Sequence, residues 1–168
     1  TLHRSSLLSG SCRIMPDTPV FSTAAVAAPH HLAAETGRNI LAQGGNAVEA
    51  MIAMAATIAV VYPHMNAIGG DGFWIIRDAR GKVHGIEACG PAGALATNKR
   101  YRDKGHDVIP SRGPDAAVTV AGAIGGWEAA REMAAAMGGR LPLPVLVEDA
   151  VKFARDGVAI STSEAKWS

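Results

Sequence analysis

The residues of this sequence that could take part in chemistry include histidines, two cysteines and a glycine cluster that contains one acidic residue. His64 follows Pro63, and an imidazole beside glycines can act as an acid or base or can hold a loop through one hydrogen bond. His30 and His31 are adjacent, so on a strand they would point to opposite faces, and no carboxylate or thiol cluster accompanies them. We expect structural roles for these three histidines and no metal site.

The glycine cluster is Gly69-Gly70-Asp71-Gly72, and it precedes a predicted strand. A phosphate-binding loop instead opens a helix and carries a Lys followed by Ser or Thr, which this cluster lacks. Because glycines let the backbone approach a bound molecule closely, Gly69 and Gly70 are predicted to lie at the floor of a pocket. Asp71 either completes the turn or lines that pocket.

The two cysteines, Cys12 and Cys89, are far apart in the sequence and form no metal-type cluster. Two free thiols are expected, and a disulfide between them stays open as the alternative. Cys89 has no basic neighbour within its motif, so it is not expected to act as a nucleophile.

The element that must position these residues is a long apolar helix, predicted from Ala47 to Val61. Asn46 and Glu49 have the spacing of a capping box, in which each side chain binds a free N–H group of the first turn. Only Glu49 and Thr57 are polar in this run, so the helix should be covered on nearly every side. The run is too short to span a bilayer, and Pro63 ends it.

Other segments have recognisable helix or strand patterns. A hairpin is predicted from Phe73–Asp78 and Lys82–Glu87, and its apolar run FWII indicates a strand covered on both faces. Phe21–Ala28 has the length of a strand. Helices are expected over residues 32–43, 127–137 and 145–157. Residues 1–22 are expected to be irregular, and residues 23–168 to form a single partial domain.

Composition and charge restrict the function classes. The chain has 168 residues, enough for one sizeable core, and 48% of them are apolar, which excludes whole-chain disorder. The 16 basic residues nearly balance the 15 acidic ones, so neither nucleic acid nor a membrane is an expected partner. No signal peptide is visible at the start, which favours a cytoplasmic protein unless a leader has been removed to reach the periplasm or the exterior.

Basic residues gather in one polar stretch between residues 94 and 114. Lys99, Arg100, Arg102 and Lys104 lie close together there, and such a run is usually a solvated face. The alternative is a mobile segment at a pocket mouth, where its positive charge would attract an acidic acyl group.

Two motifs in order, GGNAVEA and YPHMNAIGGDGFW, make the sequence resemble the large subunit of the γ-glutamyltranspeptidase family. The resemblance extends from about Val26 to Ser161 and includes Gly122, Gly126 and Leu141-Pro142. It implies an α+β fold, the αββα sandwich of N-terminal nucleophile hydrolases. This chain would supply helices and sheet strands of that sandwich but not the nucleophile.

The resemblance also implies a mechanism and a partner. Family members are made as a precursor, a zymogen that cleaves itself before a Thr, and the new N-terminal Thr of the small subunit attacks an amide. Thr1 of this chain is not assigned that role, because the motifs that follow it resemble the large subunit. The implied partners are a Thr-led small subunit and a small amide substrate, in a heterodimer or a dimer of heterodimers. No cofactor and no metal is implied, and the chain alone should be inactive.

One departure from the family pattern concerns the substrate. Placing Pro91 on the family's conserved-motif proline puts Glu87 where the family has an Arg that binds the glutamyl α-carboxylate, and puts Ala88 at the Glu that follows it. A carboxylate cannot replace the bidentate contact of a guanidinium, and it repels an α-carboxylate. The resemblance therefore marks Glu87 and Ala88 as substrate-binding positions and argues against glutamyl recognition. The alternative is that Glu87 is only a solvated strand end.

Three hypotheses for function follow. The first is a large-subunit fragment of a non-glutamyl amidohydrolase, with the oxamate amidohydrolase and acylase branches as the nearest candidates. The second is a true γ-glutamyltransferase or glutathione hydrolase whose donor-binding Arg comes from elsewhere. The third is a non-catalytic α/β binding or scaffold module, which would be folded and free of a partner when isolated.

Overall fold

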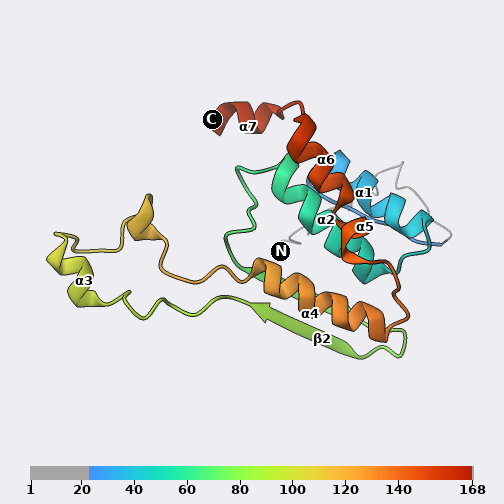
Figure 1. The fold of residues 1–168 in the computed structure, drawn as a ribbon, viewed down its shortest axis with the longest axis horizontal. Helices are drawn as coiled ribbons and strands as arrows, with labels where there is room; N and C mark the ends of the chain where they lie inside the picture. Colours follow the sequence, from blue (N-terminus) through green and yellow to red (C-terminus); the bar gives the residue numbers. More distant parts are fainter. Residues whose placement is uncertain (1–22, 168) are drawn as a thin grey trace, which may run out of the picture.

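The computed structural model describes residues 23–167 of the chain, and Figure 1 shows how its helices and its hairpin are arranged. The expectations for residues 1–22, including the irregular segment, Thr1 and the Cys12 half of a disulfide, lie outside the described residues. Cys89 is exposed and has a free thiol. Within residues 23–167, no helix has the length and apolar character that crossing a membrane requires.

Helix α2 (Ala47–Val61) has the predicted bounds and the predicted cap. The Oδ1 atom of Asn46 accepts from the N–H groups of Val48 and Glu49 at 3.1 and 3.0 Å. In return, the N–H of Asn46 donates to Oε2 of Glu49 at 2.7 Å, which completes the capping box. The helix ends at Val61, with Tyr62 as its C-cap directly before Pro63, as the sequence predicts.

Glu49 does more than cap this helix. It is only 2% exposed, and its second carboxylate oxygen accepts from the N–H of Leu141 at 2.7 Å. The carboxylate therefore joins the first turn of α2 to the segment that leads into α5 (Leu143–Leu146). Removal of this carboxylate would leave the N–H groups of Asn46 and Leu141 without their acceptor.

The helical body packs around α2. Helix α1 (His31–Ala42) and helix α6 (Glu148–Asp156) lie against it, as Figure 1 shows, and α4 (Ala123–Ala136) crosses its other side. Two buried threonines and the partly buried Asp149 form a hydrogen-bonded chain across this body. Thr57 donates to Thr36 at 3.3 Å, and Thr36 donates to Asp149 at 2.8 Å. The second polar residue of α2 is thereby satisfied in the core.

One stripe of α2 is not covered by the described residues. Met51 is 47% exposed, and its helical neighbours on the same side are also partly or fully exposed. The stripe consists of Ala47, Met51, Ala55, Ile58 and Ala59. The prediction of a helix covered on nearly every side is thus correct for the faces toward α1, α4 and α6 and wrong for this stripe. No described element lies over it.

Helix α1 is confirmed, and both of its ends follow from local chemistry. The Nδ1 atom of His30 accepts from the N–H of Leu32 at 3.3 Å, which confirms His30 as a cap. Gly44 has φ of 85°, the left-handed conformation that glycine tolerates best. The strand predicted over Phe21–Ala28 is wrong in its described part, because residues 23–28 have no neighbouring strand with which to form a ladder.

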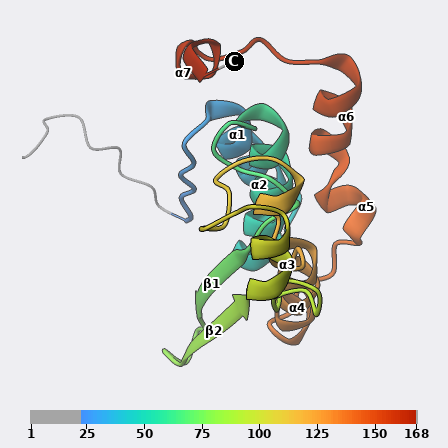
Figure 2. The same ribbon diagram turned by 90° about the vertical axis from the view of Figure 1, so that its left-hand side faces the viewer.

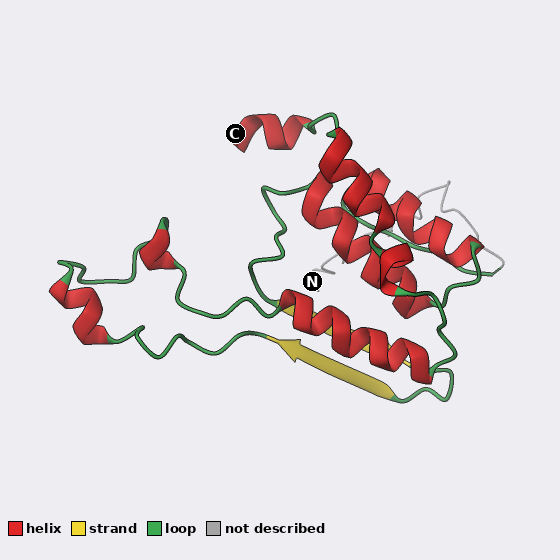
Figure 3. Cartoon of the chain, in the orientation of Figure 1, coloured by secondary structure: helices red, strands yellow, loops and turns green. Residues whose placement is uncertain are grey.

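The predicted hairpin is confirmed. Strand β1 (Gly72–Arg77) pairs with β2 (Val83–Ala88) in an antiparallel register that places Gly72 opposite Ala88 and Arg77 opposite Val83. Helix α4 covers one face of the pair, as Figures 2 and 3 show. The other face is open, with Phe73 at 70% and Ile75 at 87% exposure. Coverage on both faces is therefore a wrong prediction for the described chain, which contains a helical layer on one side only.

Two predicted helices have different bounds in the structure. Helix α4 begins at Ala123, inside the glycine-rich run that the sequence places before the helix. Gly126 explains this start, because a Cβ there would lie 2.7 Å from the Ala88 side chain, so only glycine lets the helix pack this closely on the hairpin. The helix expected over 145–157 is divided at Val147 into α5 and α6.

Residues 91–121 form an arm that projects from the body (Figure 1), and they contain the short helices α3 (Asn98–Asp103) and η1 (Pro114–Ala116). The tip has a small core of its own. The hydroxyl of Tyr101 donates to the carbonyl oxygen of Asp115 at 2.9 Å, and Lys104 forms an ion pair with the Asp115 carboxylate. The chain then returns through α4, α5 and α6 to α7 (Thr162–Trp167).

Candidate functional site

The corner of the hairpin brings together three of the residues whose types could do chemistry. Strand β1 begins where β2 ends, so Asp71 and Gly72 lie beside Ala88 and Cys89. Because alternate residues of a strand point to opposite faces, Asp71, Glu87 and Cys89 share the open face with Phe73. All three are exposed. The register therefore places Glu87 on the side of the sheet that the described residues leave uncovered.

The electrostatic potential at this corner is negative, because Asp71 and Glu87 both carry carboxylates. Partial desolvation, and then the nearby charges of Asp71 and Glu87, raise the pKa of the Cys89 thiol. A raised pKa favours the neutral thiol over the nucleophilic thiolate, in line with the expectation that Cys89 is not a nucleophile. The same corner will repel an anionic group that approaches it and will favour a cation or a hydrogen-bond donor.

The backbone at this corner is fixed by two glycines that the sequence analysis did not single out as site-forming. A Cβ on Gly90 would overlap the carbonyl group of Val120, and a Cβ on Gly122 would overlap that of Ala88. The N–H of Val120 donates to the carbonyl oxygen of Pro91 at 3.0 Å. The segment that leaves β2 thus crosses the segment that enters α4 at backbone contact. The sequence signal that could have indicated this crossing is a glycine in each segment, Gly90 after β2 and Gly122 before α4.

The glycine cluster is anchored to the start of α4. The carbonyl oxygen of Gly70 accepts from the N–H groups of Gly122 and Ala123 at 3.0 and 2.9 Å, which satisfies two donors of that helix terminus. No atom lies within 4 Å of a Cβ placed on Gly69 or Gly70. The space beside both Cα atoms is therefore open, and the role of Gly69 and Gly70 at a pocket floor stays a prediction.

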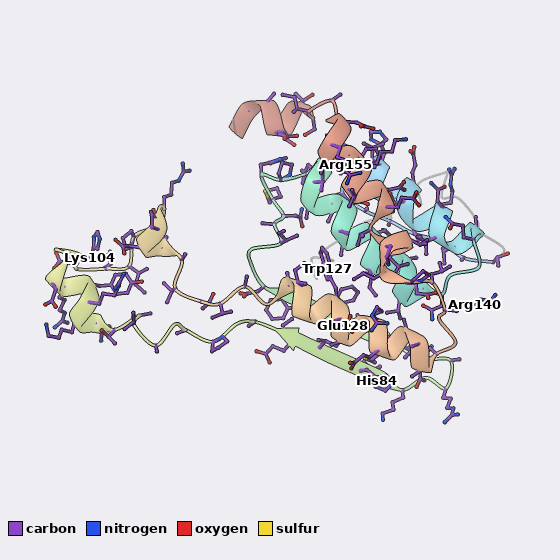
Figure 4. The ribbon with its side chains drawn as sticks, in the orientation of Figure 1. His84, Lys104, Trp127, Glu128, Arg140 and Arg155 are labelled. Atoms are coloured by element: carbon purple, nitrogen blue, oxygen red, sulfur yellow. The ribbon has the colours of Figure 1, made fainter. Side chains whose placement is uncertain are left out.

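A groove of about 240 Å³ lies beside this corner, between α2, β1 and the start of α4. Asp71 and Asn66 are its polar lining residues, and the others are apolar or glycine. Trp127, labelled in Figure 4, contributes from α4. The complete lining is Met51, Ala55, Ile58, Ala59, Asn66, Ala67, Asp71, Gly72, Phe73, Trp74, Ala123 and Trp127. The structure thus brings Asp71 to the groove, whereas Glu87 and Ala88 lie on β2, opposite Phe73 and Gly72, and do not line it.

His64 has the structural role expected of it. Its Nε2 atom lies 3.2 Å from the hydroxyl of Ser163, and its ring meets the ring of Tyr62 edge-on with centroids 4.3 Å apart. This contact joins the turn after α2 to α7. The sequence could not indicate Ser163 as the partner, because the two residues are 99 positions apart.

His30 and His31 also act structurally. Burial, and then the neighbouring His31, lower the pKa of His30, so the neutral ring that can accept through Nδ1 is favoured. The two rings stack with centroids 4.6 Å apart. Among residues 23–167 there is no group of three or more His, Cys, Asp or Glu side chains arranged to hold a metal ion.

The basic residues at 99–104 lie on the projecting arm, away from the end of β2. Figure 4 labels one of them, Lys104, on that arm. Lys99 pairs with Asp103 at 2.6 Å, and Lys104 hydrogen-bonds Asp115, which lowers the pKa of that carboxyl. The arm is a solvated face, as the sequence favours. Within this chain it does not supply a cation at Glu87.

Known proteins resemble this chain in both sequence and structure. The family model described as gamma-glutamyltranspeptidase matches residues 33–168. The oxamate amidohydrolase proenzyme of Klebsiella pneumoniae is 50% identical over 139 residues, which are 82% of this chain and 26% of that protein. The glutathione hydrolase-like YwrD proenzyme of Bacillus subtilis is 39% identical over 142 residues, covering 84% of this chain and 26% of the relative. The chain thus spans about a quarter of the length of these relatives.

A solved structure shows the same likeness. The gamma-glutamyltranspeptidase of Helicobacter pylori superposes with a TM-score of 0.79 at 30% identity, over 90% of this chain and 43% of that one. The predicted fold class is thereby confirmed, since the mixed helix and sheet arrangement matches a solved relative over nearly all of the chain.

Proposed function

The chain belongs to the gamma-glutamyltranspeptidase family, and from that premise we propose that it is the N-terminal part of the large subunit of a self-processing amide hydrolase. The names of its two relatives describe proenzymes, which supports a precursor that is cleaved to become active. The proposed assembly is a heterodimer with a Thr-led small subunit from the same precursor, or a dimer of such heterodimers.

The proposed reaction is acyl transfer from an amide to a threonine and then to water. The Thr hydroxyl oxygen bonds to the amide carbonyl carbon, and the α-amine of the same Thr takes the hydroxyl proton and passes it to the leaving nitrogen. The C–N bond breaks, the amine or ammonia departs, and water hydrolyses the acyl ester. No cofactor enters these steps. This chain contributes the helical layer and the corner that the acyl group approaches.

The single observation that carries the choice of substrate is the acidic corner at Asp71 and Glu87. An α-carboxylate at the end of a glutamyl chain would have to lie beside like charge, where the family otherwise supplies an Arg. A group without charge, or a hydrogen-bond donor, fits there better. We therefore propose that the acyl group is not γ-glutamyl.

Similarity points to the same branch. Identity to the oxamate amidohydrolase proenzyme is 50%, whereas it is 33% to the glutathione hydrolase proenzyme of Escherichia coli. Oxamate also carries a carboxylate, but that group is bonded directly to the reacting carbonyl carbon. It would sit beside the nucleophile rather than at the distant corner that receives a glutamyl α-carboxylate. Oxamate or another short amide is the proposed substrate class.

The runner-up is a glutathione hydrolase or γ-glutamyltransferase with its donor Arg supplied from outside this chain, since several relatives with that name match at 33% to 38% identity. The processed full-length protein distinguishes the two. We expect ammonia release from oxamate to exceed p-nitroaniline release from γ-glutamyl-p-nitroanilide. Faster turnover of the γ-glutamyl compound, unchanged by Glu87→Ala, overturns the proposal. A precursor that neither cleaves itself nor hydrolyses an amide favours a non-catalytic scaffold.

A further inference from the structure

A groove of about 760 Å³ lies at the turn of the hairpin, the opposite end of the two strands from the acidic corner. One wall is residues 77–80 together with His84 of β2, which Figure 4 labels. The other wall combines the start of α2 with the C-terminal end of α4. Small-molecule sites commonly enclose about 300 to 1,000 Å³, so a ligand of that class fits the groove.

The helical wall of this groove is mainly apolar. Val48, Met133 and Met137 are its largest apolar side chains, and the two methionines are partly exposed. Unbranched methionine side chains adapt to the shape of what packs on them. The start of α2 adds little charge here, because its N–H groups are capped by Asn46, whose own N–H donates to Glu49. The helices therefore offer a surface for the apolar part of a ligand.

The turn wall carries an excess of positive charge. Arg77 and Arg80 both line the groove, and neither forms an ion pair within residues 23–167. Asp78 is the acidic residue of the lining, and its carboxylate is already engaged. It accepts from the N–H groups of Arg80 and Lys82 at 2.9 Å each and lies 3.3 Å from Nε2 of His84. Two guanidinium groups thus face one carboxylate that is held by the turn itself.

The turn that presents these charges is fixed by its backbone. Gly81 has φ of 85°, and its N–H donates to the carbonyl oxygen of Asp78 at 3.0 Å. The N–H of Asp78 donates in turn to the carbonyl oxygen of Lys82 at 2.9 Å. A Cβ on Gly81 would lie 3.1 Å from Nη2 of Arg77, so this guanidinium lies directly against the turn. A preformed wall of this kind loses little freedom when a ligand binds.

We propose that this groove binds a small organic carboxylate that has an apolar body. The carboxylate pairs with Arg77 and Arg80, because a guanidinium fork matches its two oxygen atoms. The apolar body lies on Met133 and Met137. An excess of one positive charge on the turn wall suits a monoanion better than a phosphate dianion. The inference does not depend on the amide chemistry of the proposed function.

Binding of 4-phenylbutyrate to the full-length protein, measured by ligand-observed NMR titration, tests the proposal. The matched uncharged probe is 4-phenyl-1-butanol. We expect a Kd in the low millimolar range or below for the carboxylate, and binding of the alcohol that is weaker by about tenfold or more. Equal binding of the two probes overturns the proposal. A groove filled by a second copy or by another part of the precursor gives no binding, which also overturns it.

A first pair of variants locates the binding site at the turn. Arg77→Gln combined with Arg80→Gln in one protein should raise the Kd of 4-phenylbutyrate by about tenfold or more. Lys82→Gln is the matched control, because it removes a positive charge from the same turn but outside the groove lining, and it should change the Kd by less than about twofold. An unchanged Kd in the double variant overturns the proposal.

A second pair tests the helical wall and needs no change to the turn. Ala135 and Ala136 are adjacent exposed residues of α4, and of the two only Ala136 lines the groove. Ala136→Asp should weaken binding of 4-phenylbutyrate by repulsion, whereas Ala135→Asp should leave the Kd unchanged. Equal Kd values for the two variants overturn the proposal, and this comparison decides if the double arginine variant fails to fold. Oxamate hydrolysis is not the readout, so a negative result leaves the proposed function untouched.

Discussion

The two faces of the hairpin have the same kind of sequence and opposite environments. Trp74 and Ile76 pack against α4, and Ile76 is 8% exposed, whereas the adjacent Ile75 on the other face is almost fully exposed. On the covered face, Gly126 lets the helix approach the sheet closely, and the capping groups of α4 are satisfied by Gly70. The open face has no such helix in the described chain and carries the acidic corner.

The difference shows that the apolar run FWII is suited to a packing layer on each face of the sheet, and residues 23–167 supply a layer on one face only. A soluble protein rarely leaves a contiguous apolar surface of this kind without a partner. The open face is therefore where the remaining precursor should pack, and it is also where Glu87 and Asp71 lie. Structural completion and substrate recognition would then occur on one side of the sheet.

The largest expected effect comes from the backbone crossing that joins the two faces. Gly90→Ala places a Cβ into the carbonyl group of Val120, so the backbone must move, and we expect a loss of about 3 kcal/mol or more in the free energy of unfolding of the precursor. Denaturant unfolding measures it. Gly69→Ala is the control, since no atom lies within 4 Å of its Cβ and the loss should stay below about 1 kcal/mol. Equal losses for both variants contradict the crossing.

The two isoleucines compare the faces directly. Ile76→Ala removes buried methyl groups and should cost about 2 to 5 kcal/mol of unfolding free energy in the precursor. Ile75→Ala should cost about 1 kcal/mol or more there if the open face is covered, and less than about 0.5 kcal/mol if that face is solvated. Urea unfolding of the two variants beside wild type separates these cases.

Substrate preference tests the acidic corner. Glu87→Arg restores the guanidinium that the family pattern has at this position, so kcat/KM for γ-glutamyl-p-nitroanilide should rise by roughly tenfold to a hundredfold. Glu148→Arg, a charge reversal on α6 away from the corner, is the matched control and should leave it unchanged. If both variants leave γ-glutamyl turnover at the wild-type level, Glu87 is a solvated strand end.

The smallest effect concerns the buried His30 cap. Its pKa is lowered below the ordinary value of 6.5 by burial, so the unfolded chain binds a proton more readily than the folded one. The contribution of the His30 cap to the free energy of unfolding is complete above about pH 6.5. It is lost as the pH falls through the pKa that His30 has in the folded state, which is the lower of the two. His30→Asn keeps a capping side chain that does not titrate. Between about pH 7 and 5, the Tm of wild type should fall more than that of the variant.

Local patterns predicted much of the fold. The capping box of Asn46 and Glu49, the stop at Pro63 and the left-handed Gly44 need only a few neighbouring residues, and each is confirmed. The sequence did not predict the start of α4, because close packing on Ala88 and Trp74, rather than helix propensity, determines where that helix begins. The division at Val147 was also not predicted. A strand over residues 23–28 needs a neighbour that no local pattern can supply.

The candidate site, like the fold, was predictable from the sequence only where it depends on local patterns. Antiparallel pairing of two strands around a tight turn brings Asp71 to Glu87 and Cys89, so the hairpin prediction already implied this neighbourhood. The crossing at Gly90 and Gly122 was not implied, because it joins segments about thirty residues apart through backbone atoms alone. The contact between His64 and Ser163 was likewise beyond sequence patterns.

Thiol labelling of Ile75→Cys in the full-length precursor tests most directly whether the open face is covered. Cys12 and Cys89 are replaced by Ser, and mass spectrometry follows the peptide that contains position 75, with Val151→Cys as the exposed reference. If the remaining precursor packs on the open face, the thiol at 75 reacts far more slowly than the thiol at 151 until denaturant is added. Labelling at 75 as fast as at 151 in the native precursor contradicts the account.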